Sequence, residues 1–127
     1  MKKTVIATDK APAAIGPYSQ AIEVNGIIYT SGVVPIDPAT GQVVEGDIKV
    51  QATRVFESMK ALLEAAGSDL DQAVKTTVFI KDMNDFAALN EVYASYFSGD
   101  YPARSCVEVA RLPKDVLLEL EVIALKK

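Results

Sequence analysis

The chain contains no histidine and a single cysteine among its 127 residues. Without histidine, the usual zinc and iron sites, Ser-His-Asp triads and imidazole acid–base chemistry are excluded, and one cysteine cannot form a disulfide within the chain. An enzyme with this composition would use carboxylates, arginine, hydroxyls, backbone groups or the cysteine. We therefore expect no metal and no cofactor.

Long apolar runs are also missing. The charged stretch at residues 1–9 lacks the apolar core of a signal peptide, and no later stretch approaches the roughly 18 apolar residues of a membrane span. We expect a cytoplasmic protein with no membrane partner.

Basic residues are too few for a protein that binds polyanions. Thirteen Lys and Arg stand against 17 Asp and Glu, which gives a net charge of −4. Affinity for nucleic acid comes largely from Lys and Arg contacts to phosphate, so no nucleic-acid partner is expected. Hydrophobic residues make up 50% of the chain and charged residues 24%, as in globular proteins. At this length the simplest organisation is one domain over residues 1–127 with one core.

The first half of the chain predicts a hairpin and a long helix. A short β-type run at 4–7 is followed by a loop at 11–18 that two prolines and a glycine keep irregular. Asn25-Gly26 separates two β-type runs at 21–24 and 27–30, which indicates a type I′ turn. Asp47 is a plausible N-cap for a helix with helical apolar spacing, and Gly67 is placed to end it.

The second half predicts strands at 73–81, 104–110 and 116–125 around a helix that starts near Asp85. On that helix Asn90 follows Phe86 by four residues on the apolar face, so its amide should face something polar. The order of elements indicates an α+β fold of two layers, a mixed sheet with two helices on one face. The last strand shows little clean alternation, which predicts that a second copy of the chain covers the other face.

Arg104, flanked by small residues, opens the β-type run at 104–110 and needs an anionic partner. Its guanidinium is always charged and presents a fork of donors that matches a carboxylate. One interpretation is an ion pair within the chain with Glu108, Glu119 or Glu121. The other is a ligand carboxylate held by two parallel hydrogen bonds.

Glu119 and Glu121 lie two residues apart in the last strand and therefore leave the same face. Both could be surface groups, or one could occupy a partly desolvated site where burial raises its pKa and makes it a proton acceptor near neutral pH. The spacing does not separate the two glutamates. Weaker candidates, each also explained by packing, turns or capping, are Tyr18, Ser31, Gly32, Asn90 and Cys106.

Four stretches together carry a resemblance to a known family. They are residues 102–115 (PARSCVEVARLPKD) continued by Leu118-Glu119-Leu120, residues 14–21 (AIGPYSQA), residues 29–32 (YTSG) and residues 75–79 (KTTVF). In this order they resemble the signature of the RidA (YjgF) family. The resemblance implies a chorismate-mutase-like α+β fold and a homotrimer with three ligand sites in clefts between subunits.

The resemblance also implies an activity, the hydrolytic deamination of reactive enamines and imines such as 2-aminoacrylate, 2-iminopropanoate and 2-iminobutanoate to 2-keto acids and ammonia. By this resemblance Arg104 would hold the substrate carboxylate and Glu119 would hold or activate the attacking water. The residues expected to line the site are Tyr18, Ser31, Gly32, Asn90, Arg104 and Cys106. Family subgroups without the arginine lack the activity, so Arg104 groups this chain with the active members.

Three other functions stay open on the sequence. The chain could bind small carboxylic or 2-keto acids through Arg104 without turnover, or it could act like a chaperone. It could also be a translation inhibitor or ribonuclease, as family members have been described, although the negative charge and missing histidine disfavour this. Modest machinery suffices for imine hydrolysis, since positioning a water and holding a carboxylate need neither metal nor histidine.

Overall fold

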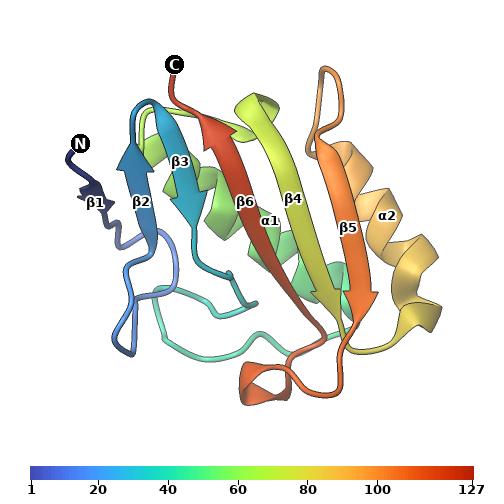
Figure 1. Ribbon diagram of the computed structural model, residues 1–127. Coiled ribbons are helices and arrows are strands. Elements are labelled where there is room, and N and C mark those ends of the chain that lie inside the picture. Colours follow the sequence, from blue (N-terminus) through green and yellow to red (C-terminus); the bar gives the residue numbers. More distant parts are fainter.

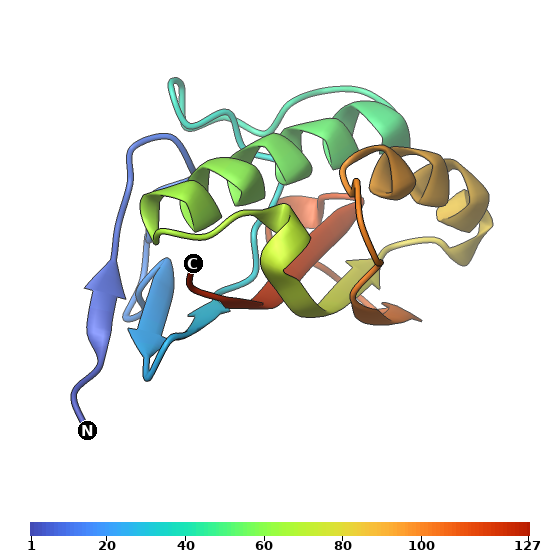
Figure 2. The ribbon, with the colours of Figure 1, turned by 90° about the horizontal axis from the view of Figure 1, so that it is seen from above.

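The computed structural model describes residues 1–127 and has two layers, a six-stranded sheet and two helices (Figure 1). Seen from above, both helices lie on the same side of the sheet (Figure 2), which confirms the predicted α+β architecture. The strands are β1 Thr4–Ile6, β2 Ala21–Val24, β3 Ile27–Thr30, β4 Ala73–Ile80, β5 Ala103–Glu108 and β6 Leu118–Leu125. The helices are α1 Ile48–Ala65 and α2 Phe86–Ser95, with 3₁₀ turns η1 Leu70–Gln72, η2 Met83–Asp85 and η3 Pro113–Asp115. Neither helix has the length and apolarity needed to cross a membrane.

The strands follow the order β1-β2-β3-β6-β4-β5, in which only β4 and β5 run parallel. The hairpin β2–β3 turns at Asn25 and Gly26, whose φ angles of 54° and 78° are those of the predicted type I′ turn. A parallel pair needs a long crossover, and α2 supplies it between β4 and β5. The sequence pattern predicted these elements correctly, with ends that shift by one or two residues.

Both ends of α1 are satisfied as predicted. The Asp47 carboxylate accepts a hydrogen bond from the Val50 N–H at 3.1 Å. At the other end Gly67 has a φ of 81°, its N–H donates to the Glu64 carbonyl at 3.1 Å, and the Ser68 N–H donates to the Leu63 carbonyl at 2.9 Å. This pair of bonds is the Schellman motif, which ends the helix and returns the chain towards β4.

The core lies between the helices and one face of the sheet. It is built from α1, α2 and the inward residues of β4 and β6, among them Val55, Phe56, Met59, Val78 and Leu120. The irregular alternation expected for the last strand is wrong, because β6 alternates strictly between buried residues and half-buried ones up to Ala124. Three apolar residues hide this alternation in the sequence, because Ile123 lies on the outer face and Leu117 and Leu125 lie at or beyond the strand ends.

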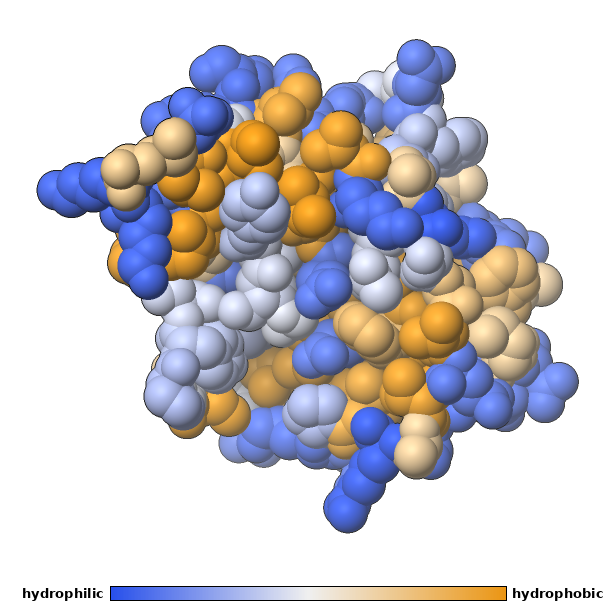
Figure 3. Space-filling model, viewed as in Figure 1, coloured by the Kyte–Doolittle hydropathy of each residue, from blue (hydrophilic) through white to orange (hydrophobic).

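No element of the chain covers the other face of the sheet, which Figure 3 shows as a mixture of apolar and polar surface. Apolar side chains on this face include Phe79, Val107 and Ile123, and the exposed fraction of Val107 is 44%. An apolar sheet face of this kind is typical of a surface that another protein chain covers. This face agrees with the expected oligomer, which stays a prediction.

Candidate functional site

The predicted site residues fall into two groups on opposite faces of the sheet. In the β4–β5 pair Arg104 lies beside Thr76, which is buried under the helices. In the β4–β6 pair Glu119 lies opposite Phe79, the outward neighbour of Val78. Residues paired across neighbouring strands share a face, so Arg104 lies on the helix side and Glu119 on the open side.

Arg104 is held against α2. Its Nη1 donates a hydrogen bond to Asn90 Oδ1 at 2.7 Å, so the amide predicted to face a polar group does so. Cys106 follows two residues later on the same face and is half-buried. Burial raises the pKa of the Cys106 thiol, and the nearby Arg104 charge opposes that rise only in part, so the thiol is neutral at pH 7. We call Asn90, Arg104 and Cys106 the arginine half-site.

Arg104 takes part in none of the four ion pairs of the chain. The Glu108 carboxylate accepts a hydrogen bond from the Met83 N–H at 2.8 Å instead. Glu119 and Glu121 lie on the other face. The interpretation of Arg104 as an ion-pair partner within its own chain is therefore wrong. The fork opens instead into a cleft of about 390 Å³ beside α2.

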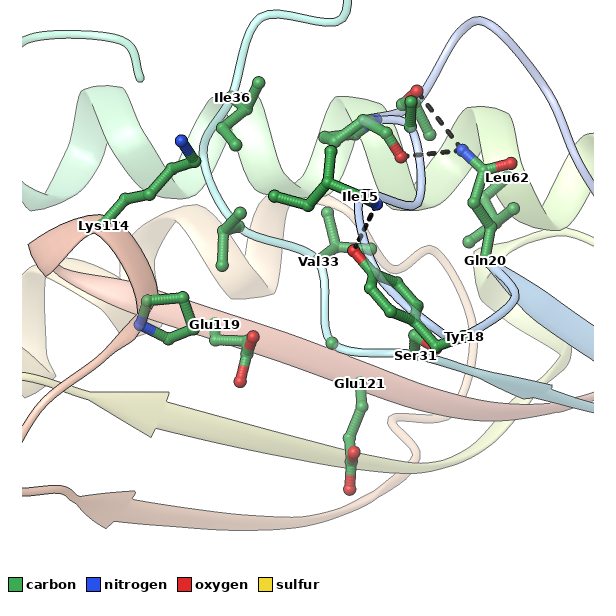
Figure 4. Close-up of a pocket in the computed structure, with 16 residues that line it drawn as sticks. Ile15, Tyr18, Gln20, Ser31, Val33, Ile36, Leu62, Lys114, Glu119 and Glu121 are labelled. Atoms are coloured by element: carbon green, nitrogen blue, oxygen red, sulfur yellow. Dashed lines mark hydrogen bonds between the residues drawn. The ribbon is translucent and has the colours of Figure 1, made fainter. Parts of the chain in front are cut away.

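Glu119 lies in a second cavity, of about 540 Å³, between β6 and the segments that lead into and out of the β2–β3 hairpin (Figure 4). Tyr18, Ser31 and Gly32 line it with Glu119, and we call these four residues the glutamate half-site. Burial raises the pKa of Glu119, and the neighbouring negative charge of Glu121 adds to that rise. A carboxylate with a raised pKa is a better proton acceptor, as the sequence interpretation required.

Gly32 lies directly against Glu119. The backbone of Val33 pairs with that of Leu120 through hydrogen bonds of 2.7 and 3.0 Å, which fixes the segment after β3 onto β6. A Cβ atom on Gly32 would lie 2.5 Å from Glu119 Cδ. Only glycine leaves room for the carboxyl group in this position.

Hydrogen bonds hold the other two residues of the glutamate half-site. Ser31 Oγ donates to the Ser19 carbonyl at 2.6 Å. The Tyr18 hydroxyl accepts from the Ile15 N–H at 3.4 Å, a bond that Figure 4 shows. Gln20 also lines this cavity, is only 8% exposed, and accepts from the Thr8 N–H at 2.7 Å, which shapes the loop that the prolines keep irregular. Sequence reasoning missed Gln20, although a glutamine directly before an apolar strand was a usable signal.

Lys114 is a further residue that the sequence interpretation missed. It lies in η3 and lines the cavity that contains Glu119. Both Lys114 and Asp115 have left-handed φ angles, 57° and 55°. Arg111 binds the Asp115 carboxylate through Nε at 2.9 Å and Nη2 at 3.3 Å across this turn. The sequence predicted a turn here, and although aspartate is enriched in left-handed backbone, lysine is not, so the angle of Lys114 had no signal in its residue type.

Comparison with known proteins identifies the family of the chain. The family described as Endoribonuclease L-PSP matches residues 8–126. A 2-iminobutanoate/2-iminopropanoate deaminase of Salmonella typhimurium is 53% identical over 130 residues, which cover 100% of both chains. The chain belongs to the RidA (YjgF) family.

Other members of the RidA family carry less specific names. A RutC family protein of Pyrococcus abyssi is 59% identical over 127 residues, with 100% of both chains covered. The crystal structure of E. coli TdcF with bound serine superposes with a TM-score of 0.93 at 46% identity, covering 98% of this chain and 99% of that one. The mixed sheet with two helices is therefore the fold of RidA family structures.

Proposed function

We propose that this RidA family protein hydrolyses small 2-imino acids, and their enamine tautomers, to 2-keto acids and ammonia. The observation that carries the proposal is Arg104, a half-buried guanidinium that has an amide partner but no carboxylate in its own chain. A half-buried arginine that has no anionic partner in its own chain is suited to bind the carboxylate of a ligand, which it can hold in two hydrogen bonds. The deaminase name of the Salmonella relative and the serine in the TdcF structure, an α-amino acid, agree with this ligand class.

The active site in this proposal is formed by two copies of the chain. Arg104 and Glu119 lie on opposite faces of one sheet, so a ligand of a few atoms does not reach both within one chain. Glu119 lies on the sheet face that no helix covers, and this face is the surface on which a neighbouring copy would place its arginine half-site. A closed ring of three copies, as the family resemblance implies, would make three equivalent sites.

In such a site the two halves have different tasks. Arg104 orients the substrate through its carboxylate, which fixes the C=N carbon relative to the glutamate half-site. Glu119, as the carboxylate, accepts a proton from a water that attacks this carbon, and a C–O bond forms while the C=N π bond breaks. The resulting carbinolamine loses ammonia after the nitrogen takes up a proton, and the 2-keto acid remains. Water supplies the oxygen, and no oxidant or metal is consumed.

The test is the variant Arg104→Lys, which keeps the charge and loses the fork. We expect kcat/KM for 2-iminobutanoate, generated in a coupled dehydratase assay, to fall about 10- to 100-fold, since one charge-assisted hydrogen bond is lost. Arg54→Lys, on α1 at a residue that lines neither cavity, is the matched control and should keep the parent rate. Equal rates for Arg104→Lys and the parent would exclude the proposed role, and binding of 2-ketobutyrate without any turnover by the parent would exclude the reaction.

A further inference from the structure

Two aromatic rings of α2 lie against the Arg104 guanidinium. Its central carbon is 4.7 Å from the centroid of the Tyr93 ring and 5.2 Å from that of Phe86. Both distances are within the range of cation–π attraction. Together with Asn90, which accepts the single side-chain hydrogen bond of Arg104, the two rings surround the charged group on its helix side.

The sequence spacing on α2 explains the arrangement. Phe86, Asn90 and Tyr93 follow one another at intervals of four and three residues, which places them on one stripe of the helix. This stripe faces β5 and presents a ring, an amide and a second ring in succession. The sequence pattern predicts that the amide meets a polar group, and the structure shows that a ring on either side of it meets the same guanidinium.

Tyr93 is itself fixed at both ends. Its hydroxyl shares a 2.7 Å hydrogen bond with the Thr76 hydroxyl, and Thr76 lies directly beside Arg104 in the strand register. Its ring packs edge-on against Phe56, with centroids 5.5 Å apart, and lies 4.9 Å from the Phe97 ring. A ring held in this way has little freedom to move away from the guanidinium.

Rings and an amide differ from a carboxylate as neighbours of an arginine. They attract the cation and restrict its rotamers, but they leave its charge unneutralised and its remaining N–H groups free. Arg104 lines the cleft that Tyr101 and Pro102 also line, so this cleft is the space in which a ligand can meet these N–H groups. Much of the ordering that a flexible arginine undergoes on binding an anion is thereby completed before the ligand arrives.

We infer that Tyr93 and Phe86 are positioning residues for anion binding, which act by holding the Arg104 fork in its binding orientation. The inference rests on the proposed function only for the identity of the ligand, a small 2-keto or 2-imino acid. It makes the ring of Tyr93 the important group and its hydroxyl secondary. The hydroxyl serves to hold the ring through Thr76.

The variants Tyr93→Leu and Phe86→Leu remove one ring each, and Tyr93→Phe keeps the ring but loses the bond to Thr76. Tyr96→Leu is the matched control, because Tyr96 stacks on Phe56 at 5.0 Å in the same aromatic cluster but does not lie over Arg104. We expect the ring-deleted variants to bind 2-ketobutyrate about 5- to 10-fold more weakly by calorimetry and to raise KM with kcat nearly unchanged. Tyr93→Phe and Tyr96→Leu should stay within about twofold of the parent.

A measurement without ligand makes the test independent of the reaction. The NMR order parameter of the Arg104 Nε–Hε bond should be near the rigid value of about 0.85 in the parent and in Tyr96→Leu, and below about 0.6 in Tyr93→Leu. A rigid Arg104 in Tyr93→Leu, or equal losses of binding in Tyr93→Leu and Tyr96→Leu, would overturn the inference. A parent that orders Arg104 as expected but binds no 2-keto acid would refute the proposed function and leave the positioning role supported.

Discussion

Replacing Gly32 by alanine should disable Glu119 while leaving the fold intact. The added Cβ would lie 2.5 Å from Glu119 Cδ, 2.7 Å from Oε2 and 2.8 Å from Cγ, whereas ordinary contacts begin at 3.4 Å. The carboxyl group is the far end of a flexible side chain, so it will move away, by roughly 1 Å, before the backbone does. The variant therefore displaces the proton acceptor without changing its chemistry.

The size of the effect follows from this displacement. A shift of about 1 Å at a reacting group costs about 10²-fold in rate, or about 2.7 kcal/mol of transition-state stabilisation. Gly32 has no positive φ, so alanine fits its backbone, and the loss of a flexible glycine favours folding by about 0.4–1 kcal/mol. We expect kcat for 2-iminobutanoate to fall about 100-fold with a melting temperature within a few degrees of the parent.

Gly99→Ala is the matched control for this variant. Gly99 also lacks a positive φ, and no atom lies within 4 Å of the position its Cβ would take. The coupled dehydratase assay should give the parent rate for Gly99→Ala and the low rate for Gly32→Ala at equal protein concentration. A Gly32→Ala protein with the parent kcat would refute the reasoning, because it would show that the position of the Glu119 carboxyl group does not matter for turnover.

Three further results are expected from the charges and caps. Burial raises the pKa of Glu119, and the negative charge of Glu121 is the smaller cause of the rise. Glu121→Gln should therefore move the acid limb of the pH profile of kcat/KM to lower pH. An acid limb that does not move would contradict this coupling between the two glutamates. The pKa of Glu119 in the folded protein lies above its unfolded value of about 4.3, so the free energy of unfolding falls as the pH rises between these two pKa values. Glu119→Gln should therefore be more stable than the parent to urea at pH 7 and equal to it below about pH 4. Asp47→Ala removes the N-cap of α1 and should cost about 1 kcal/mol, or about 3–5 °C in melting temperature, with kcat unchanged, while Asp47→Asn should retain most of the stability.

The features that short stretches encode could be predicted from the sequence. Asn25-Gly26 determined the hairpin, and Asp47 with Gly67 determined both ends of α1, because each depends on backbone angles or caps within a few residues. The spacing on α2 likewise predicted a polar partner for Asn90. Each of these predictions uses interactions within one element and its immediate flanks.

The relation between Arg104 and Glu119 could not be predicted in this way. Alternation assigns faces within one strand, but comparing two strands requires their order and register, here the pairing of β4 with both β5 and β6. These contacts join residues far apart in the chain, and no local pattern records them. The left-handed angle of Lys114 was missed because lysine is not among the residue types enriched in that conformation.

The opposite faces of Arg104 and Glu119 lead to a final prediction, complementation between two impaired variants. If each site takes Arg104 from one copy and Glu119 from the next, a site is intact when its arginine comes from a Glu119→Gln chain and its glutamate from an Arg104→Lys chain. Random assembly of the two variants in equal amounts, after joint unfolding and refolding, should therefore restore about one quarter of the parent activity. If one chain supplied both residues, every site in the mixture would keep a defect and no activity above that of the separate variants would return. The mixed assembly thus tests the two-chain site by turnover alone, with each variant refolded separately as the control.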